Sequence, residues 1–225
     1  VILVEGSGKL LGSMSEKSSA DALRDLGQLL VDVRLNTIMK SYDGKVATFA
    51  DGSTIETEML IWTAGVVGVP FTLEGADAAA GRGGRFEVDE YNAVKDVDGV
   101  YAVGDIALMA TKDYPHGHPQ VAQVAIQQGR RLAKNLNRPD KRKPFAYKDK
   151  GSMATIGRNR AVVDMGKVHL GGRIAWMAWM FIHLISLLGM RNRLVVLINW
   201  TVSYFSYSSG LRLILNQNRY PLKDE

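Results

Sequence analysis

The sequence predicts an α/β fold followed by apolar helices near its C-terminal end. Short apolar runs bounded by glycine turns are typical of buried strands, and leucines at helical spacing indicate an amphipathic helix between them. The stretch "IAWMAWMFIHLISLLGM" at 174–190 contains no Asp, Glu, Lys or Arg and is long enough for a helix. With 225 residues, of which 46% are hydrophobic and 23% charged, the chain has the composition of one large or two small globular domains.

Residues 1–65 are predicted to form a strand, a helix and a β-meander. "VILVEG" is a short apolar strand that ends in Glu5. A helix is predicted over 16–30, where the leucines at 23, 26, 29 and 30 recur at helical spacing. The Asp-Gly pairs at 43–44 and 51–52 separate short β runs, which predicts two hairpin turns before the run "STIETEMLIWTAG". This order is that of the back half of a nucleotide-binding α/β domain.

The middle of the chain is predicted to place an acid at the end of a buried strand. After a strand at 85–90, the run 99–104 reads as a second strand that delivers Asp105. A helix is predicted over 120–137, with Pro119 before it and "NRPDKRKP" after it. The glycine-rich "AGRGG" at 80–84 is not a phosphate loop, because no strand leads into it.

The C-terminal part is predicted to contain two strands in "YKDKGSMATIGRNRAVVDMG" and two helices, 174–190 and 194–215. The first helix is at the lower limit for spanning a bilayer, and the second carries too many polar side chains. We therefore expect both to lie in or against a membrane surface. A helical hairpin through the membrane and a buried helix pair in a larger soluble dimer remain as alternatives.

Composition and charge exclude several classes of site. There is no cysteine, which excludes disulfide scaffolds, thiolate metal sites and a redox-active cysteine pair within this segment, and the four histidines lack metal-motif spacings, so no metal site is predicted. Residues 1–129 hold 10 basic and 18 acidic residues, and residues 130–225 hold 18 and 5, giving −8 and +13. The basic half indicates a nucleic acid, a membrane surface or simply a solvated face. Because aromatic residues gather in 174–207 with few charges between them, a nucleic acid is disfavoured.

Asp105 sits where α/β folds bind ligands, beyond the carboxyl end of a strand. Gly104 lets a hydroxyl-rich or pyrophosphate group approach the backbone, although a bare Gly-Asp is more often a solvated turn. "GVYAVGDIA", about 30 residues after "LIWTAG", resembles the paired motifs of FAD-linked pyridine-nucleotide oxidoreductases. The resemblance implies that Asp105 binds the ribityl and pyrophosphate part of FAD and that Ala64–Gly65 joins the NAD-binding to the FAD-binding domain. It also implies that Glu5 holds the adenosine ribose, which favours NADH over NADPH.

The helix narrows the family. "AQVAIQQG" at 122–129, "KGSMATIGRNRAVVDMG" and the Trp-rich C-terminal stretch resemble type II NADH dehydrogenases, the single-chain NADH:quinone oxidoreductases that do not pump protons. This implies a partial two-dinucleotide-binding-domain flavoprotein fold plus C-terminal membrane-associated helices. The implied division is 1–65 for the rest of the NAD domain, 66–145 for the C-terminal part of the FAD domain and 146–225 for the membrane and quinone region. The implied reaction passes hydride from NADH to FAD and two electrons on to a membrane quinone.

The glutamines of this helix are the main candidates for the quinone site. Gln120, Gln123 and Gln127 share a face beside Ala122 and Ala125, and a helix N-terminus there can stabilise charge on reduced flavin. The resemblance implies cofactor contacts for Gly104, Ala122 and Gln123. It implies a quinone site lined by Gln123, Ile126, Gln127 and Ile185, with His183 as a candidate proton donor. Without the family, a solvent-facing glutamine stripe and a packed histidine are the simpler interpretations.

The expected partners follow from the same resemblance: a membrane quinone, an anionic lipid surface and, as a further candidate, a second copy of the chain. We expect a peripheral protein on the cytoplasmic face of a bacterial inner membrane. Because the chain starts in mid-strand and lacks both G-x-G-x-x-G loops of the family, it is expected to be a C-terminal portion that binds FAD poorly and is inactive alone. A sulfide:quinone oxidoreductase, which would need cysteines, and a cofactor-less membrane tether remain as rivals.

Overall fold

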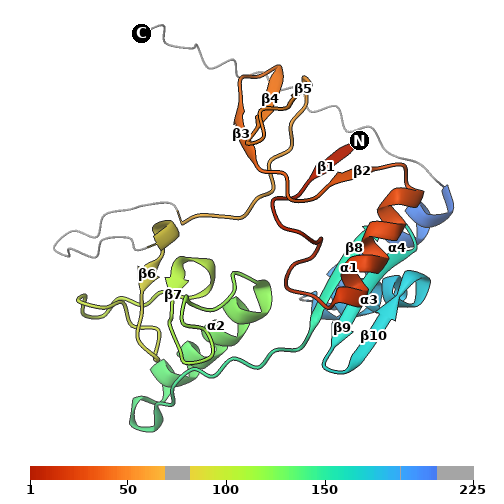
Figure 1. The fold of residues 1–225 in the computed structure, drawn as a ribbon. Coiled ribbons are helices and arrows are strands. Elements are labelled where there is room, and N and C mark those ends of the chain that lie inside the picture. The colour runs from red at the N-terminus through yellow and green to blue at the C-terminus, as the bar shows by residue number, and fades with distance from the viewer. Residues whose placement is uncertain (69–81, 188, 207–225) are drawn as a thin grey trace, which may run out of the picture. The chain divides into compact units, whose positions relative to one another are not determined.

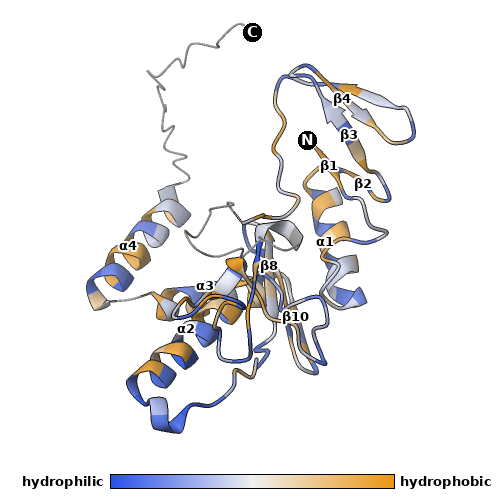
Figure 2. Cartoon of the chain, turned by 90° about the vertical axis from the view of Figure 1, so that its left-hand side faces the viewer, coloured by the Kyte–Doolittle hydropathy of each residue, from blue (hydrophilic) through white to orange (hydrophobic). Residues whose placement is uncertain are grey.

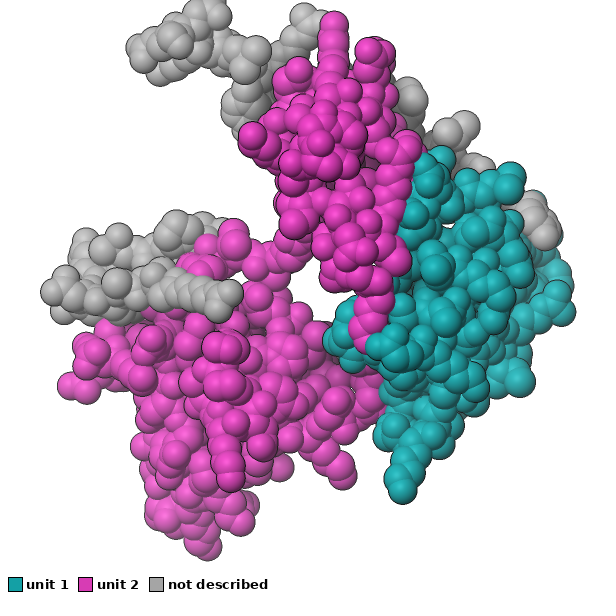
Figure 3. Space-filling view, viewed as in Figure 1, with its two compact units in different colours: residues 1, 10–33, 153–225 teal, residues 2–9, 34–152 magenta. Residues whose placement is uncertain are grey.

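The computed structural model describes residues 1–68, 82–187 and 189–206 (Figure 1). The chain divides into two compact units (Figure 3). Unit 1 comprises Val1, Leu10–Val33 and Met153–Glu225, and unit 2 comprises Ile2–Lys9 and Arg34–Ser152. Each unit is described by itself.

Unit 2 begins with β1 (Ile2–Val4) and contains a three-stranded antiparallel meander of β3 (Met39–Tyr42), β4 (Val46–Phe49) and β5 (Thr54–Glu56). Both predicted hairpins are confirmed. Gly44 and Gly52 take the left-handed conformation that each turn needs, and the Asp43 carboxylate accepts the N–H groups of Lys45 and Val46.

The predicted last strand of the meander is shorter than expected. β5 ends at Glu56, and residues 57–65 form no strand in the described structure. Met59, Ile61 and Trp62 are 77%, 77% and 62% exposed. An apolar run becomes a buried strand only where neighbouring strands take up its N–H and C=O groups, and β4, the neighbour of β5, begins at Val46 opposite Glu56 and pairs with no later residue of this run in a ladder.

The second half of unit 2 packs short elements against one long helix. β6 (Phe86–Glu87) pairs in parallel with β7 (Ala107–Leu108), and α2 runs from Ala122 to Asn137. Three 3-10 turns, η1 (Arg82–Gly84), η2 (Gly104–Ile106) and η3 (Pro139–Lys141), complete this part. The core is made of eight buried residues: Phe86, Val88, Val94, Ala102, Ala107, Met109, Val124 and Phe145.

The predicted strand at 99–104 is wrong. Residue Tyr101 makes only an isolated bridge to Ala93, and Gly104–Ile106 forms a 3-10 turn, so Asp105 precedes strand β7 instead of following a strand. The cause is a tight loop that folds back on itself, with Asn92 in the left-handed conformation and its buried amide donating to the carbonyl of Ala102 at 3.0 Å.

Unit 1 is built on a three-stranded antiparallel sheet in the order β10-β9-β8. β8 (Ser152–Gly157) and β9 (Arg160–Met165) are the two predicted strands, whereas β10 (Val168–Gly171) was not predicted. Helices α1 (Glu16–Gln28) and α3 (Gly172–Ser186) both pack on β9 and β10. Short β2 (Asp32–Arg34) follows α1.

Strand β9 is covered on both faces. Ala161, Val162 and Val163 are all fully buried, although successive side chains of a strand point to opposite faces. Ala161 and Val163 form a cluster with Ala175 of α3, while the next residue, Asp164, bonds to Ser15 at the start of α1. The alternation therefore places α1 and α3 on opposite faces of the sheet, which Figure 1 lets the reader follow.

The helix predicted over 16–30 is confirmed as α1, but it buries another face. Ser18, Ser19, Ala22 and Asp25 are buried, whereas Leu30 is 88% exposed and Leu23 and Leu29 are also exposed. A polar network explains this orientation: Ser18 lies 3.2 Å from His169, and Asp25 lies 3.6 Å from Arg160.

The C-terminal helices are α3 and α4 (Met190–Ser206), and residues 207–215 of the second predicted helix lie outside the described residues. Figure 2 shows both hydrophobic and hydrophilic residues along α4. Large apolar side chains on both helices are exposed: Ile174, Met177, Phe181, Ile182, Ile185, Leu194, Val195, Leu197, Ile198, Val202 and Phe205. Within the described residues, neither of them nor any other helix has the length and hydropathy required to span a bilayer.

Candidate functional site

The Gly104–Asp105 turn is held directly on helix α2. The N–H of Gly104 donates to the side-chain carbonyl of Gln128 at 2.6 Å, and the amide of Gln120 donates to the backbone carbonyl of Asp105 at 3.1 Å. Gly104 has φ +74°, and a Cβ there would lie 3.0 Å from the Cβ of Ala125. The turn is thus fixed through its backbone, which leaves the Asp105 carboxylate exposed beside a buried glycine.

A buried arginine joins the strand after this turn to the segment before α2. Arg85 Nη2 donates to the carbonyls of Ala107 at 2.6 Å and His118 at 3.1 Å. Burial lowers the pKa of Arg85, and the negative charge of Asp105 opposes that effect. Burial, and then the positive charge of Arg85, lower the pKa of His118, so this ring is neutral near pH 7. Arg85 therefore holds strand β7 to the segment before α2, and it forms no ion pair within the described residues.

The N-terminus of α2 is open to a ligand. Its N-cap residue, Val121, makes no side-chain capping bond, the first turn contains no acid, and Ala122 is exposed. Helix N-termini of this kind carry partial positive charge and unsatisfied N–H groups, which favour an anion. The Asp105 carboxylate can accept hydrogen bonds from a polyhydroxyl chain. The N–H groups at Ala122 can stabilise a ring that gains negative charge. The residues present fit FAD.

The two glutamines predicted to contact quinone have their amides engaged elsewhere. Gln127 bonds both the N–H and the carbonyl of Lys148, at 3.0 and 2.9 Å. Gln123 accepts from the N–H of Lys150 and donates to the carbonyl of Gly151, both at 3.1 Å. Ile126, between them in sequence, is 52% exposed. The structure brings Gln123 and Gln127 together, but with a backbone segment between their amides.

The sequence patterns do not identify two residues that hold the backbone around the Asp105 turn, Gln128 and Arg85. Gln128 is 1% exposed and binds Gly104, yet in sequence it is only the second glutamine of "QQG". Arg85 is the second of two arginines in a glycine-rich stretch, "GRGGR" at 81–85. The one available signal was the phase of the helix, because residue 128 lies one turn after Val124, which faces the core.

The remaining candidates of unit 2 make local contacts. Glu5 follows β1, and its carboxylate accepts the N–H of Ser7 at 2.8 Å. Ala64 and Gly65 are exposed, and Gly65, with φ +87°, donates its N–H to the carbonyl of Thr63 at 2.9 Å. No hydrogen bond in the described structure links either group to the Asp105 turn.

His183 and Ile185 belong to α3 in unit 1. The ring of His183 stacks on Trp179 at a centroid distance of 4.0 Å, and its Nδ1 lies 2.7 Å from the Trp179 carbonyl. Because a carbonyl only accepts, Nδ1 carries a proton, and a neutral ring would have its lone pair on Nε2. Ile185 is 49% exposed.

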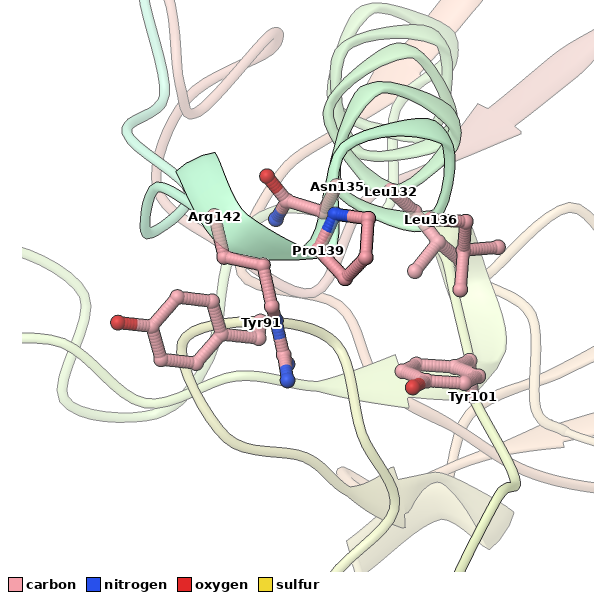
Figure 4. A pocket seen from close by; sticks show the side chains of 7 residues that line it. All are labelled: Tyr91, Tyr101, Leu132, Asn135, Leu136, Pro139 and Arg142. Carbon is pink, nitrogen blue, oxygen red and sulfur yellow. The ribbon is translucent and has the colours of Figure 1, made fainter.

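A small pocket lies at the other end of α2 (Figure 4). It has a volume of about 90 Å³ and is lined by Tyr91, Tyr101, Leu132, Asn135, Leu136, Pro139 and Arg142. On the helix its lining begins at Leu132, about 6 Å beyond Gln128, whose side chain binds Gly104. Within the described residues, no three His, Cys, Asp or Glu side chains are placed to hold a metal ion.

Two family models match most of the chain. The profile of the pyridine nucleotide-disulphide oxidoreductase family matches residues 1–129, and that of the NDH2 C-terminal domain matches residues 150–206. The type II NADH:quinone oxidoreductase NdhA of Mycobacterium tuberculosis is 36% identical over 98% of this chain and 49% of its own length. The internal alternative NAD(P)H-ubiquinone oxidoreductase A1 of Solanum tuberosum mitochondria is 30% identical over 89% of this chain and 44% of its own.

Solved structures agree on the fold. The structure of NDH2 from Plasmodium falciparum in complex with NADH superposes with a TM-score of 0.80 and 18% identity, over 91% of this chain and 57% of that one. The chain spans about half the length of the curated relatives that it matches.

Proposed function

The chain belongs to the pyridine nucleotide-disulphide oxidoreductase family and, within it, to the type II NADH dehydrogenases, and we propose that it is the C-terminal part of an FAD-dependent NADH:quinone oxidoreductase. In this proposal residues 1–65 complete an NAD-binding domain, 66–145 an FAD-binding domain, and 146–225 form the membrane and quinone region.

The observation that carries the proposal is the Gly104–Asp105 turn beside the open N-terminus of α2. The exposed carboxylate of Asp105 can accept hydrogen bonds from the hydroxyls of the ribityl chain, and Gly104 leaves room for them. Ala122 and Gln123 start the helix whose free N–H groups would stabilise negative charge on the flavin ring, were FAD bound at this turn. When bound, FAD supplies the electron transfer from NADH to quinone.

The nicotinamide nucleotide is assigned to the N-terminal segment. Glu5 ends β1 with an acid that can accept hydrogen bonds from both ribose hydroxyls and repels a 2′-phosphate, which favours NADH. Ala64–Gly65 is the crossing between the two nucleotide-binding domains. The exposed apolar side chains of Ile2, Met59, Ile61 and Trp62 support this, because a complete domain would cover them.

The quinone and the membrane are assigned to α2, α3 and α4. In unit 2 the candidate for quinone contact is the exposed Ile126, with Gln123 and Gln127 holding the backbone beside it, and in unit 1 the candidates are His183 and Ile185. The exposed apolar side chains of α3 and α4, together with the +13 charge of residues 130–225, suit a peripheral protein on an anionic surface. We assign it to the cytoplasmic face of a bacterial inner membrane. A second copy of the chain is the other candidate to cover this apolar surface.

The proposal is tested by flavin content. In protein expressed from the complete gene, Asp105→Ala should lower the FAD retained per chain, since two hydroxyl hydrogen bonds to a charged acceptor are lost, about 1.5–3 kcal/mol each. Asp113→Ala, an exposed acid of the same unit, is the matched control and should retain FAD. Equal flavin content in both variants would contradict the assignment of Asp105.

A further inference from the structure

We propose that Gln123 and Gln127 are positioning residues that clamp the backbone of Lys148–Gly151, the segment that leads into strand β8. This role concerns the path of the chain itself and does not depend on the proposed activity. It differs from a direct ligand contact, because each amide donates to and accepts from the backbone of this segment.

Four hydrogen bonds form the clamp. Gln127 bonds both polar backbone groups of Lys148, at 2.9 and 3.0 Å, as a strand residue bonds its partner across a ladder. Gln123 bonds the N–H of Lys150 and the carbonyl of Gly151, each at 3.1 Å, with a longer contact of 3.4 Å to the Asp149 carboxylate. Each side-chain amide thus replaces one peptide group of a missing neighbouring strand.

The spacing of the glutamines fits this function. Residues four apart on a helix are offset by about 6 Å along its axis, and alternate residues of extended backbone by about 6.6 Å. Gln123 and Gln127 are four apart, and the N–H groups that they bind, on Lys150 and Lys148, are two apart. The helical repeat and the extended repeat therefore match over one turn, with the chains running in opposite directions.

The clamped segment is fixed from both ends. On one side, Tyr147 packs against the core and its ring contacts Tyr114 and His118; burial, and then the charge of Asp149, raise the pKa of Tyr147 to about 12. On the other side, the Asp149 carboxylate accepts the N–H of Gly151 at 2.8 Å, and Gly151 turns the chain with φ +92°. The clamp lies between these two anchors, so removing it should free Lys148–Gly151 without unfolding α2.

Limited digestion with trypsin measures this directly, because Lys148 and Lys150 are themselves cleavage sites. In the full chain, Gln127→Ala and Gln123→Ala should each raise the cleavage rate in 148–151 by about tenfold, since each removes two hydrogen bonds and cleavage tracks the open population. Gln120→Ala, a glutamine of the same region with its amide on Asp105, should not. Cleavage at Arg130 and Arg131 in α2 reports general unfolding and should stay constant.

Hydrogen exchange keeps the proposal testable in the unsubstituted protein. The amides of Lys148 and Lys150 should exchange slowly, and each substitution should accelerate its own partner: Gln127→Ala the Lys148 amide, and Gln123→Ala the Lys150 amide. If both amides of the unsubstituted protein exchange at the rate of an unstructured chain, the proposed clamp is wrong. This measurement does not depend on whether a variant folds. Unchanged cleavage in both variants alongside a raised KM for quinone would overturn it in favour of direct contact.

Discussion

Gly104 combines two requirements that no residue with a side chain meets together. Its φ of +74° lies in the left-handed region, and a Cβ would stand 3.0 Å from that of Ala125 on a packed helix. Gly104→Ala should therefore lower the free energy of unfolding by roughly 1–3 kcal/mol. The measurement is a urea titration of the purified chain.

Gly129→Ala is the matched control for that substitution. Gly129 lies inside α2, and a Cβ there meets nothing within 4 Å, so alanine should raise stability by about 0.5–1 kcal/mol. If both variants shift the urea midpoint in the same direction, the packing of the Gly104 turn on α2 is not as described.

Among single residues, the sequence predicts the ligand-facing Asp105 better than the residues that hold the surrounding backbone in place. Asp105 and Gly104 follow from a motif, since a charge beside a glycine after an apolar run needs an explanation. Gln128 and Arg85 do not, because each acts on a backbone group 24 and 22 residues away in sequence. Such contacts depend on how the helix docks: helical phase places residue 128 on the buried face, but no local pattern gives the backbone group that it binds.

At the scale of elements, helix α1 is attached to the sheet of unit 1 by a polar cluster. Asp164 accepts hydrogen bonds from the Ser15 N–H at 2.8 Å and lies 3.0 Å from the ring of His169, whose other nitrogen lies 3.0 Å from Asp21. Burial alone would raise the pKa of Asp164, but the hydrogen bonds from Ser15, His169 and Ser18 outweigh it and lower the pKa to about 2.

This shift predicts a pH dependence. A carboxyl with a folded pKa of about 2 and an ordinary value of 3.8 stabilises the fold above pH 4 and loses that contribution as the pH falls from 4 to 2. Above pH 4 the free energy of unfolding of the unsubstituted protein should exceed that of Asp164→Asn by about 2 kcal/mol. This difference should vanish near pH 2.

Tryptophan fluorescence during urea unfolding is a suitable measurement, because Trp176, Trp179 and Trp200 all lie in unit 1. Asp113→Asn serves as the control and should show no such trend. A difference between the unsubstituted protein and Asp164→Asn that stays constant from pH 6 to pH 2 would show that Asp164 is not stabilised as an anion.

Helices α3 and α4 give the second prediction at this scale. Phe181 is 63% exposed on α3, and burying it in a lipid surface is worth roughly 1.5–3 kcal/mol. Phe181→Glu should lower binding to vesicles rich in anionic phospholipid at least tenfold. Leu30→Glu adds the same charge at a leucine of unit 1 that is 88% exposed and should leave binding unchanged. The measurement is vesicle sedimentation. If Phe181→Glu and Leu30→Glu lose vesicle binding equally, the loss comes from the added negative charge and not from the missing apolar side chain.

The elements themselves were predicted where the pattern is strong. The helices at 16–28 and 122–137 and both Asp-Gly hairpins follow from periodicity and turn chemistry. The buried face of α1 could not be predicted, because its leucines point outward while Ser18 and Asp25 pair with His169 and Arg160 from strands more than 130 residues away. The strand predicted at 99–104 does not form, because an apolar run needs a neighbouring strand to pair with. Here the chain folds back on itself in a tight loop.

At the scale of the whole molecule, the two halves of the sequence differ as the proposed function requires. The acidic half holds the segments that we propose to bind nucleotides, and the basic half holds the exposed apolar helices. Charge and composition predicted this division; the division into two units by contacts depends on long-range packing and was not predicted.

The most direct test of the central claim is quinone reduction by protein expressed from the complete gene. We expect one FAD per chain and reduction of a short-chain quinone driven by NADH, with no reduction driven by sulfide. Protein that is well folded but holds no flavin, or that reduces quinone with sulfide and not with NADH, would contradict it.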